Sequence, residues 1–396
     1  ESFLAGNTTF STLKWRAGWG IVGQQDIFND YAYIPNYMPS SSTASYQFGN
    51  DFVTMLRPDA YDYNLQWEKT ATTNIGLDFG FLKNRINGAV DVYQKYTYDL
   101  LGVVPIPAGT NFSNRVLTNV GQMSNRGIEA NVNFVLVSNE TSTFEIGVNG
   151  ALNRNKILKL ALVDDTASPG IQVGGISGGV GNTIQIHALN NPMFTYFGFE
   201  QRFDANGRPI EKSTTPNLGS YSGMVDIDGD GKISDIEAYV DQNGDGVINT
   251  ADLKVFRNRS PEPRTLFGLS LNFTHKRWSG GATVRAELGQ YVYNNVRSVN
   301  GNYFSVGGSQ PHLTNLTSDF LESQFRTPQY LSSYYLENAS YLRLDNLYLS
   351  YNLGKLYKDR FASSLNISMQ NALVLTKYRG LDPEIAGVID NNLYPR

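Results

Sequence analysis

The feature that most constrains the fold is an alternation of apolar and polar residues that recurs along the chain. Residues 74–81 (NIGLDFGF), 128–136 (IEANVNFVL) and 267–274 (FGLSLNFT) show this pattern. Because successive side chains of a β-strand point to opposite faces, each stretch predicts a strand with one apolar and one polar face. Each is also close to the roughly nine to eleven residues that a tilted strand needs to cross a bilayer.

Composition favours an all-β chain that meets a membrane, if at all, through strands. Hydrophobic residues make up 41% of the sequence, yet no stretch approaches the roughly eighteen unbroken apolar residues of a membrane-spanning helix. The chain has no cysteine, so disulfides and thiolate metal sites are excluded. The net charge of -4 provides no basic footprint, which argues against nucleic acid as a partner.

Connection lengths distinguish a transmembrane barrel from a soluble antiparallel sandwich, whose strands also alternate. Outer-membrane barrels join their strands by short periplasmic turns and long extracellular loops in turn. Nine candidate strands, beginning with 11–20, follow this rule, with short turns expected near 83–85, 138–141, 275–278 and 354–360. Long connections are expected from about 100 to 126, from 155 to 264 and from 289 to 339. Because bacterial single-chain barrels have even strand numbers, the nine strands are expected to form only part of a barrel.

Polar positions of these strands carry several charged residues. On the barrel interpretation they point into the lumen, where water or a plug would surround them. The residues concerned are Asp78, Glu129, Arg285 and Glu287.

Two consecutive Asp-rich loops within the 155–264 excursion form the sharpest chemical motif. Residues 226–237 (DIDGDGKISDIE) match the spacing of an EF-hand calcium loop. Calcium prefers six to eight oxygen ligands around a sharp turn, and carboxylates at alternate positions, a glycine at the bend and a final bidentate glutamate supply them. The predicted ligands are Asp226, Asp228, Asp230, the carbonyl of Lys232, and Glu237.

Residues 241–252 (DQNGDGVINTAD) repeat the motif immediately afterwards. Aspartate replaces the bidentate glutamate at the last position, which should weaken calcium binding. The predicted ligands are Asp241, Asn243, Asp245, the carbonyl of Val247, and Asp252. Only 238–240 separate the two loops, too few residues for paired EF-hand helices, so the hypothesis is a structural calcium that orders a surface loop. A solvated Asp/Gly turn without metal is the alternative.

Five segments, taken in order along nearly the whole chain, resemble the barrel half of SusC/RagA-type TonB-dependent transporters of the Bacteroidetes. Three of these segments are specific in combination: 119–129 (NVGQMSNRGIE), 337–344 (ENASYLRL) and 376–384 (TKYRGLDPE). The other two are 13–23 (LKWRAGWGIVG) and 67–77 (WEKTATTNIGL).

The resemblance implies that residues 1–396 are a partial C-terminal domain of a 22-stranded antiparallel transmembrane β-barrel. It also implies an outer-membrane location with extracellular loops, a plug energised through TonB, a SusD-like surface lipoprotein as lid, and contact with outer-membrane lipid. The transported molecule would be an oligosaccharide or an oligopeptide. The plug, the TonB box and the first strands of the family have no counterpart here, so the chain is expected to be truncated at both ends.

A secreted calcium-binding β-sandwich adhesin or carbohydrate-binding module is the rival from another class. Such a protein has no reason to alternate long and short connections, which argues against it. An enzyme is not expected, because no nucleophile and base form a recognisable pair and the three histidines lie in separate segments.

Overall fold

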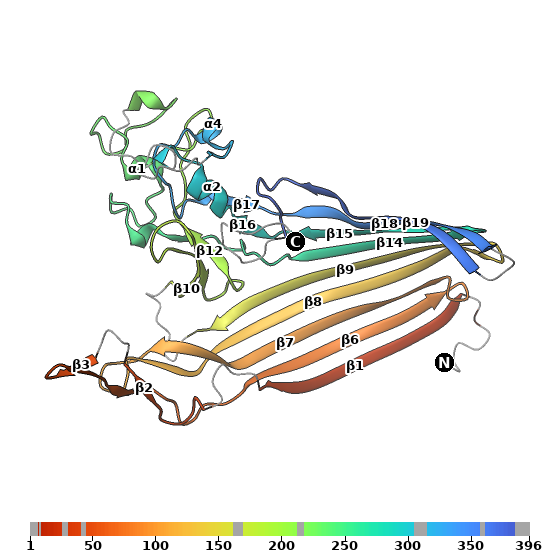
Figure 1. The fold of residues 1–396 in the computed structure, drawn as a ribbon, viewed down its shortest axis with the longest axis horizontal. Helices are drawn as coiled ribbons and strands as arrows, with labels where there is room; N and C mark the ends of the chain where they lie inside the picture. The colour runs from red at the N-terminus through yellow and green to blue at the C-terminus, as the bar shows by residue number, and fades with distance from the viewer. Residues whose placement is uncertain are drawn as a thin grey trace.

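The computed structural model describes residues 7, 9–25, 31–40, 45–160, 169–211, 218–304, 315–356 and 361–384. Its main feature is one nine-stranded antiparallel sheet, whose strands run side by side along the long axis of Figure 1. The order in the sheet is β1 (Phe10–Gln24), β6 (Glu68–Phe81), β7 (Ile86–Pro105), β8 (Arg115–Asn139), β9 (Ser142–Lys159), β14 (Thr265–His275), β15 (Trp278–Leu288), β18 (Tyr341–Leu356) and β19 (Phe361–Thr376). The nine predicted strands are therefore confirmed, as is the all-β antiparallel fold class.

The register between the strands produces one continuous apolar face, called the outer face below. Residues directly opposite each other in neighbouring strands lie on the same face of the sheet. One row across all nine strands is entirely apolar: Trp15, Leu77, Val90, Ala130, Gly150, Phe267, Ala286, Leu342 and Leu375. Large side chains on this face remain exposed, with Trp15 at 71% and Ile367 at 68%. No second sheet covers them in the part of the chain that the structure describes, as the sandwich alternative would require.

The opposite face, called the lumen face below, is polar. The next row of the register contains Lys14, Asp78, Ala89, Asn131, Asn149, Gly268, Arg285, Arg343 and Val374. Glu129 lies opposite Asp91 on this same face, and Glu287 lies opposite Tyr341. The prediction that Asp78, Glu129, Arg285 and Glu287 share the polar face is confirmed.

The short connections lie together at one end of the sheet (Figure 1). Residues 82–85, 140–141 and 276–277 form three of the predicted turns between consecutive strands. The fourth, predicted at 354–360, includes residues 357–360, which lie outside the described residues, as do the two chain ends, 1–6 and 385–396.

One predicted long connection is wrong. Residues 100–126 do not form a loop, because β7 continues to Pro105 and β8 begins at Arg115. Asp99 adopts a left-handed φ of 60° and the register shifts beside it, so the alternation breaks although the strand continues. Beyond the break the hairpin buries Val104, Val116 and Val120 against one another. The excursion predicted from 155 likewise starts later, after Lys159.

The remaining long connections carry short elements at the other end of the sheet (Figure 1). Residues 25–67 hold two hairpins, β2 (Tyr37–Pro39) with β5 (Leu56–Pro58) and β3 (Ser45–Phe48) with β4 (Asp51–Thr54). Residues 160–264 hold β10 (Ile171–Gly175), β11 (Thr183–His187), β12 (Thr195–Gly198), β13 (Lys254–Val255), η2 (Leu218–Ser220), α1 (Asp235–Ala238) and η3 (Thr250–Asp252). Residues 289–340 hold β16 (Tyr291–Tyr293), α2 (Asn295–Asn300), α4 (Phe320–Ser323), η4 (Ser333–Tyr335) and β17 (Leu336–Asn338). Among the described residues, no helix has both the length and the apolar character to cross a membrane.

The excursions 160–264 and 289–340 fold together into one unit, called the extracellular unit below. Its largest apolar core draws on both: Ile176, Ile184, Tyr196 and Phe256 come from the first, and Tyr293, Phe325, Tyr335 and Leu336 from the second. The backbone of Phe199 also bonds to Leu331 and Ser333 at 2.8 Å each. The two longest connections are therefore one folded body at the mouth of the sheet.

A charge on the outer face should cost far more than the same charge on the lumen face. Leu269→Arg places a guanidinium in the middle of β14 facing lipid, and we expect it to destabilise the folded protein by about 2–4 kcal/mol. Ser270→Arg is the matched control on the adjacent residue, which faces the lumen, and should change stability by about 1 kcal/mol or less. Unfolding of the full-length protein in lipid vesicles by denaturant measures both. Equal destabilisation by the two variants would contradict the assignment of the faces.

Candidate functional site

The first Asp-rich loop folds around its own carboxylates. Asp226 accepts hydrogen bonds from the backbone N–H groups of Gly229 (2.7 Å) and Gly231 (2.9 Å), and both glycines have positive φ. Asp230 accepts from the N–H of Lys232 at 2.8 Å. A residue with a backbone φ near +75° is strained unless it is glycine, so these two glycines allow the sharp bend.

Glu237, the last position of this loop, is fully buried and closes it. Its carboxylate accepts from the N–H of Ile227 at 3.2 Å and from the N–H of Ser234 at 2.7 Å. Carboxylate oxygens of Asp226, Asp228 and Glu237 lie within 4.8 Å of one another. Ligands that share one calcium ion at 2.3–2.6 Å are separated by no more than about 5 Å, so this spacing fits a single ion. Asp230 lies outside that group, although it belongs to the same loop.

The second loop repeats this hydrogen-bond pattern residue by residue. Asp241 accepts from Gly244 (2.7 Å) and Gly246 (2.9 Å), and Asp245 accepts from Val247 (2.8 Å). Asp252 is fully buried and accepts from Gln242 (2.9 Å) and Asn249 (2.8 Å), as Glu237 does in the first loop. The N–H donors, that of Gly246 most of all, lower the pKa of Asp241. The side chain of Asp252 is shorter than that of Glu237, yet it accepts from the backbone N–H groups at the equivalent positions of its own loop.

A small apolar core fixes both loops to the extracellular unit. Ile233 is buried with Ile210, Tyr221 and Tyr239, and Ile248 packs against the same cluster. Ile233 and Ile248 occupy equivalent positions in the two motifs, seven residues after Asp226 and Asp241. The α-helix at the end of the first loop, α1, has four residues. The loops are therefore rigidly attached turns, and no helix pair is present in this region that could open.

Three arginines of the lumen face, Arg16, Arg285 and Arg343, form ion pairs with carboxylates. Arg16 contacts both Asp78 and Asp91 at 2.9 Å. Arg285 contacts Glu287 (2.9 Å), Asp345 (3.2 Å) and Glu384 (2.7 Å). Arg343, which is almost fully buried, bonds to Asp382 at 2.6 Å. Asp382 and Glu384 follow β19 in sequence, so these ion pairs fold the segment after β19 back against the wall.

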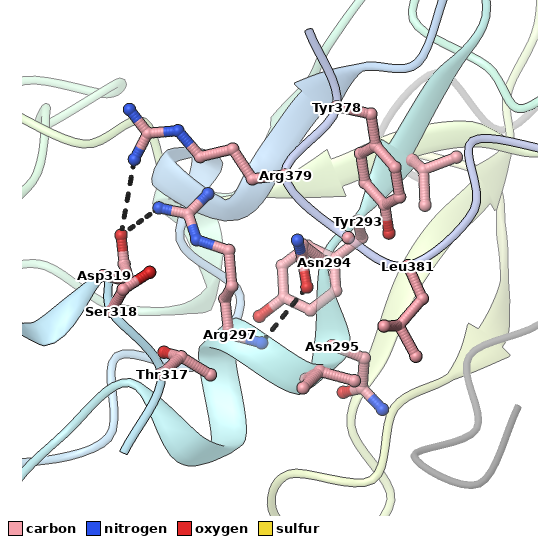
Figure 2. A pocket seen from close by; sticks show the side chains of 13 residues that line it. Tyr293, Asn294, Asn295, Arg297, Thr317, Ser318, Asp319, Tyr378, Arg379 and Leu381 are labelled. Atoms are coloured by element: carbon pink, nitrogen blue, oxygen red, sulfur yellow. Dashed lines mark hydrogen bonds and ion pairs between the residues drawn. The ribbon is translucent and has the colours of Figure 1, made fainter. Parts of the chain in front are cut away.

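A cavity of about 270 Å³ lies where this returning segment meets the extracellular unit (Figure 2). Residues of α2, of 317–319 and of 378–381 line it. In Figure 2 Arg297, Asp319 and Arg379 lie on one side, and Tyr378 and Leu381 on the other. Burial raises the pKa of Tyr378, so its hydroxyl stays protonated and can donate a hydrogen bond.

Asp319 is the centre of the charged side of this cavity. Arg297 binds it, Tyr334 donates to it at 2.7 Å, and Arg379 approaches at 3.8 Å. Arg297 also bonds to Glu337, and Asn294 caps its helix by accepting from the Arg297 N–H at 3.1 Å. The contacts of Arg297, Tyr334 and Arg379 with Asp319 all use its Oδ1, and its Oδ2 is buried without a hydrogen-bond partner among the described residues. The cavity is therefore bordered by this ion-paired cluster on one side and by the Tyr378 side chain on the other.

Comparisons with known proteins agree on one family. No protein-family model matches the chain. Over 403 aligned residues it is 34% identical to the TonB-dependent receptor SusC of Bacteroides thetaiotaomicron, covering 100% of this chain and 37% of that receptor. The chain is a homologue of the TonB-dependent receptor SusC. A second relative, the TonB-dependent receptor P3 of Formosa agariphila, is 28% identical over 99% of this chain and 38% of its own length.

The fold of this SusC homologue is shared with solved structures. The RagAB peptide transporter superposes with a TM-score of 0.71 at 24% identity, over 98% of this chain and 40% of that chain. The RagAB peptide importer in its open-open state gives 0.70 at 23% identity. The family resemblance read from the sequence is confirmed, and it places the chain in the outer membrane. The chain spans about two-fifths of the length of the relatives that it matches.

Sequence reasoning missed the cavity of Figure 2 entirely. The segment 376–384 was noticed only for its resemblance to the SusC family, and Arg297 and Asp319 carried no signal. These residues meet through tertiary packing over large sequence separations, and no local spacing encodes it. Both predicted calcium loops fold as compact turns around their acidic residues.

Breaking the buried Arg297–Asp319 pair should loosen the extracellular unit. Asp319→Ala leaves the buried Arg297 guanidinium with Glu337 as its remaining carboxylate and removes the acceptor of the Tyr334 hydroxyl, and we expect a cost of roughly 1–3 kcal/mol. Glu322→Ala removes an exposed partner of Arg379, whose pairing is worth about 0–1 kcal/mol, and serves as control. Protease resistance of the extracellular unit in the purified full-length protein measures both. If Asp319→Ala were as resistant as Glu322→Ala, the pair would not hold the unit together.

Proposed function

We propose that the chain forms the C-terminal part of the barrel of an outer-membrane importer that takes up an oligosaccharide or an oligopeptide. The observation that carries the proposal is the division of one sheet into an apolar outer face and a charged lumen face whose far end is covered by the extracellular unit. A wall of this kind can surround a polar solute while its other side contacts lipid. The likeness to SusC supports energy coupling through TonB.

The same proposal includes a SusD-like lipoprotein as partner and the cavity near Asp319 as part of the substrate path. The likeness to SusC and to the RagAB peptide transporter supports the partner. The cavity supports the path, because it lies between the extracellular unit and the segment folded against the lumen face. Its mixture of amide, hydroxyl and charged groups suits sugars and peptides alike.

Uptake by the native host tests this function. We expect deletion of the full-length gene to abolish growth on one class of oligomer, glycan or peptide, as sole carbon source. Loss of TonB or collapse of the proton gradient should have the same effect, and a tagged receptor should purify with a lipoprotein. A protein that stays monodisperse without detergent, together with unchanged growth on every oligomer, would instead favour the secreted adhesin.

We further propose that the first Asp-rich loop binds calcium through Asp226, Asp228, the carbonyl of Lys232 and Glu237, with Asp230 completing the set. The convergence of three carboxylates within 4.8 Å supports this. The second loop, with Asp241, Asn243, Asp245, the carbonyl of Val247 and Asp252, would bind more weakly. In both cases the ion would fix the orientation of a surface loop.

Calcium should therefore stabilise the extracellular unit. At a free concentration about 100 times the dissociation constant we expect roughly 2.7 kcal/mol of added stability. Asp226→Asn with Asp228→Asn should remove most of this effect, and Asp241→Asn with Asp245→Asn a smaller part. Glu140→Gln, in a short turn at the other end of the sheet, is the control. This stabilisation is measured as the protease resistance of the extracellular unit in the presence of calcium compared with that in the presence of a chelator. An identical calcium response in all variants would contradict the site.

A further inference from the structure

On the outer face of β8 and β9 the side chains change from apolar to basic within one step along the strands. The register pairs Ile128 with Leu152, then Arg126 with Arg154, and then Ser124 with Lys156. Two residues along a strand advance about 6.6–6.8 Å, so the basic group begins one step beyond the last apolar pair. It lies toward the end of the long connections, which is the extracellular end of such a barrel.

These basic side chains have no acidic partner among the residues that the structure describes. Arg126, Arg154 and Lys156 are exposed, and none makes an ion pair within the described ranges. Arginines of the lumen face differ, because Arg16 and Arg285 each contact at least two carboxylates. Like charges directly opposite each other across two strands repel. An anion bound between Arg126 and Arg154 would therefore reduce the electrostatic repulsion between these two side chains.

Two adjoining hollows surround this pair. The one toward the membrane centre has a volume of about 610 Å³ and is lined on the apolar side by Ile75, Val92, Ile128 and Leu152. The other has about 640 Å³ and is lined by Arg126, Arg154, Lys156 and Arg264 together with polar side chains. Gln94, Arg126, Arg154 and Arg264 line both. The hollows therefore form one groove with an apolar end and a basic end.

One carboxylate, Glu262, also lines the basic hollow. It is engaged by the side-chain amide of Asn155, which donates to it. Burial raises the pKa of Glu262. The hollow therefore has an excess of positive charge, because Arg126, Arg154 and Lys156 are exposed and Glu262 is the one acid among the described residues that line it.

We propose that this groove binds a phosphorylated lipid of the outer leaflet, with its phosphate between Arg126 and Arg154 and its first acyl segment over Ile128 and Leu152. Guanidinium groups bind phosphate oxygens bidentately, and Lys156 adds a third cation at the same edge. A free phosphate would use only the basic end, whereas a lipid uses both ends of the groove. The proposal rests on the outer-membrane location of the strands and does not depend on import.

The test uses the purified full-length receptor in detergent and compares three probes. These are bisphosphorylated lipid A, lipid A from which the phosphates have been removed, and inorganic phosphate. Binding is measured by native mass spectrometry and by competition. We expect the phosphorylated lipid to bind at least about tenfold more tightly than the dephosphorylated one, since each charge-assisted contact is worth that much or more.

Matched variants assign the effect to the groove. Arg126→Gln with Arg154→Gln should remove the preference for the phosphorylated lipid, and Lys156→Gln should reduce it. Lys95→Gln removes a cation from the neighbouring position of β7, which faces the lumen, and should leave the preference unchanged. Unchanged circular dichroism and gel mobility of the variants would show that the barrel still folds.

Three outcomes would overturn the proposal. One is equal binding of the two lipids by the wild-type protein. Another is an undiminished preference in the Arg126→Gln, Arg154→Gln variant. The last is complete displacement of the lipid by inorganic phosphate at concentrations similar to those of the lipid, which would mean that only an anion site is present. The growth phenotype of the host is not part of this test, so failure here leaves the import proposal untouched.

Discussion

The constraint on which the whole structure depends is that backbone polar groups in a lipid interior must find partners within the protein. The sheet meets it by pairing each strand with its neighbour from β1 to β19. In the part of the chain that the structure describes, β1 and β19 each have a strand neighbour on one side only. The outer edges of such strands are the positions at which a larger barrel continues.

Pairing in a fixed register then decides where charge can lie. A shift of one residue would move Leu269 to the lumen and Ser270 to the lipid. The register is therefore strongly determined, because one face of the sheet contacts lipid and the other contacts water. On the lumen face the arginines are surrounded by carboxylates, as Arg285 is by Glu287 and Asp345. On the outer face of β8 and β9 charge lies toward the extracellular end, where Arg126 and Arg154 meet without an acidic partner among the described residues.

The extracellular unit obeys a different rule, because it is surrounded by water and has an apolar core of its own. Tyr196 and Phe256 from one excursion pack against Tyr293 and Tyr335 from the other. A second, smaller core with Ile233 and Tyr239 holds the Asp-rich loops, and the cavity near Asp319 lies where the unit meets the segment after β19. The segment that returns after β19 connects this unit to the wall, since Asp382 pairs with Arg343 of β18 while Arg379 reaches Asp319.

The sequence by itself determined the nine strands, their faces and the position of the Asp-rich loops. These features are local: alternation has a period of two, and ligand spacing is contained within twelve residues. The hairpin beyond Asp99 was missed because a bulge broke the period while the backbone pairing went on. Only the tertiary structure decided which distant residues meet, such as Arg297 with Asp319, or Arg126 with Arg154. Such contacts depend on packing and on strand register between segments far apart in the chain, and no short stretch of sequence contains that information.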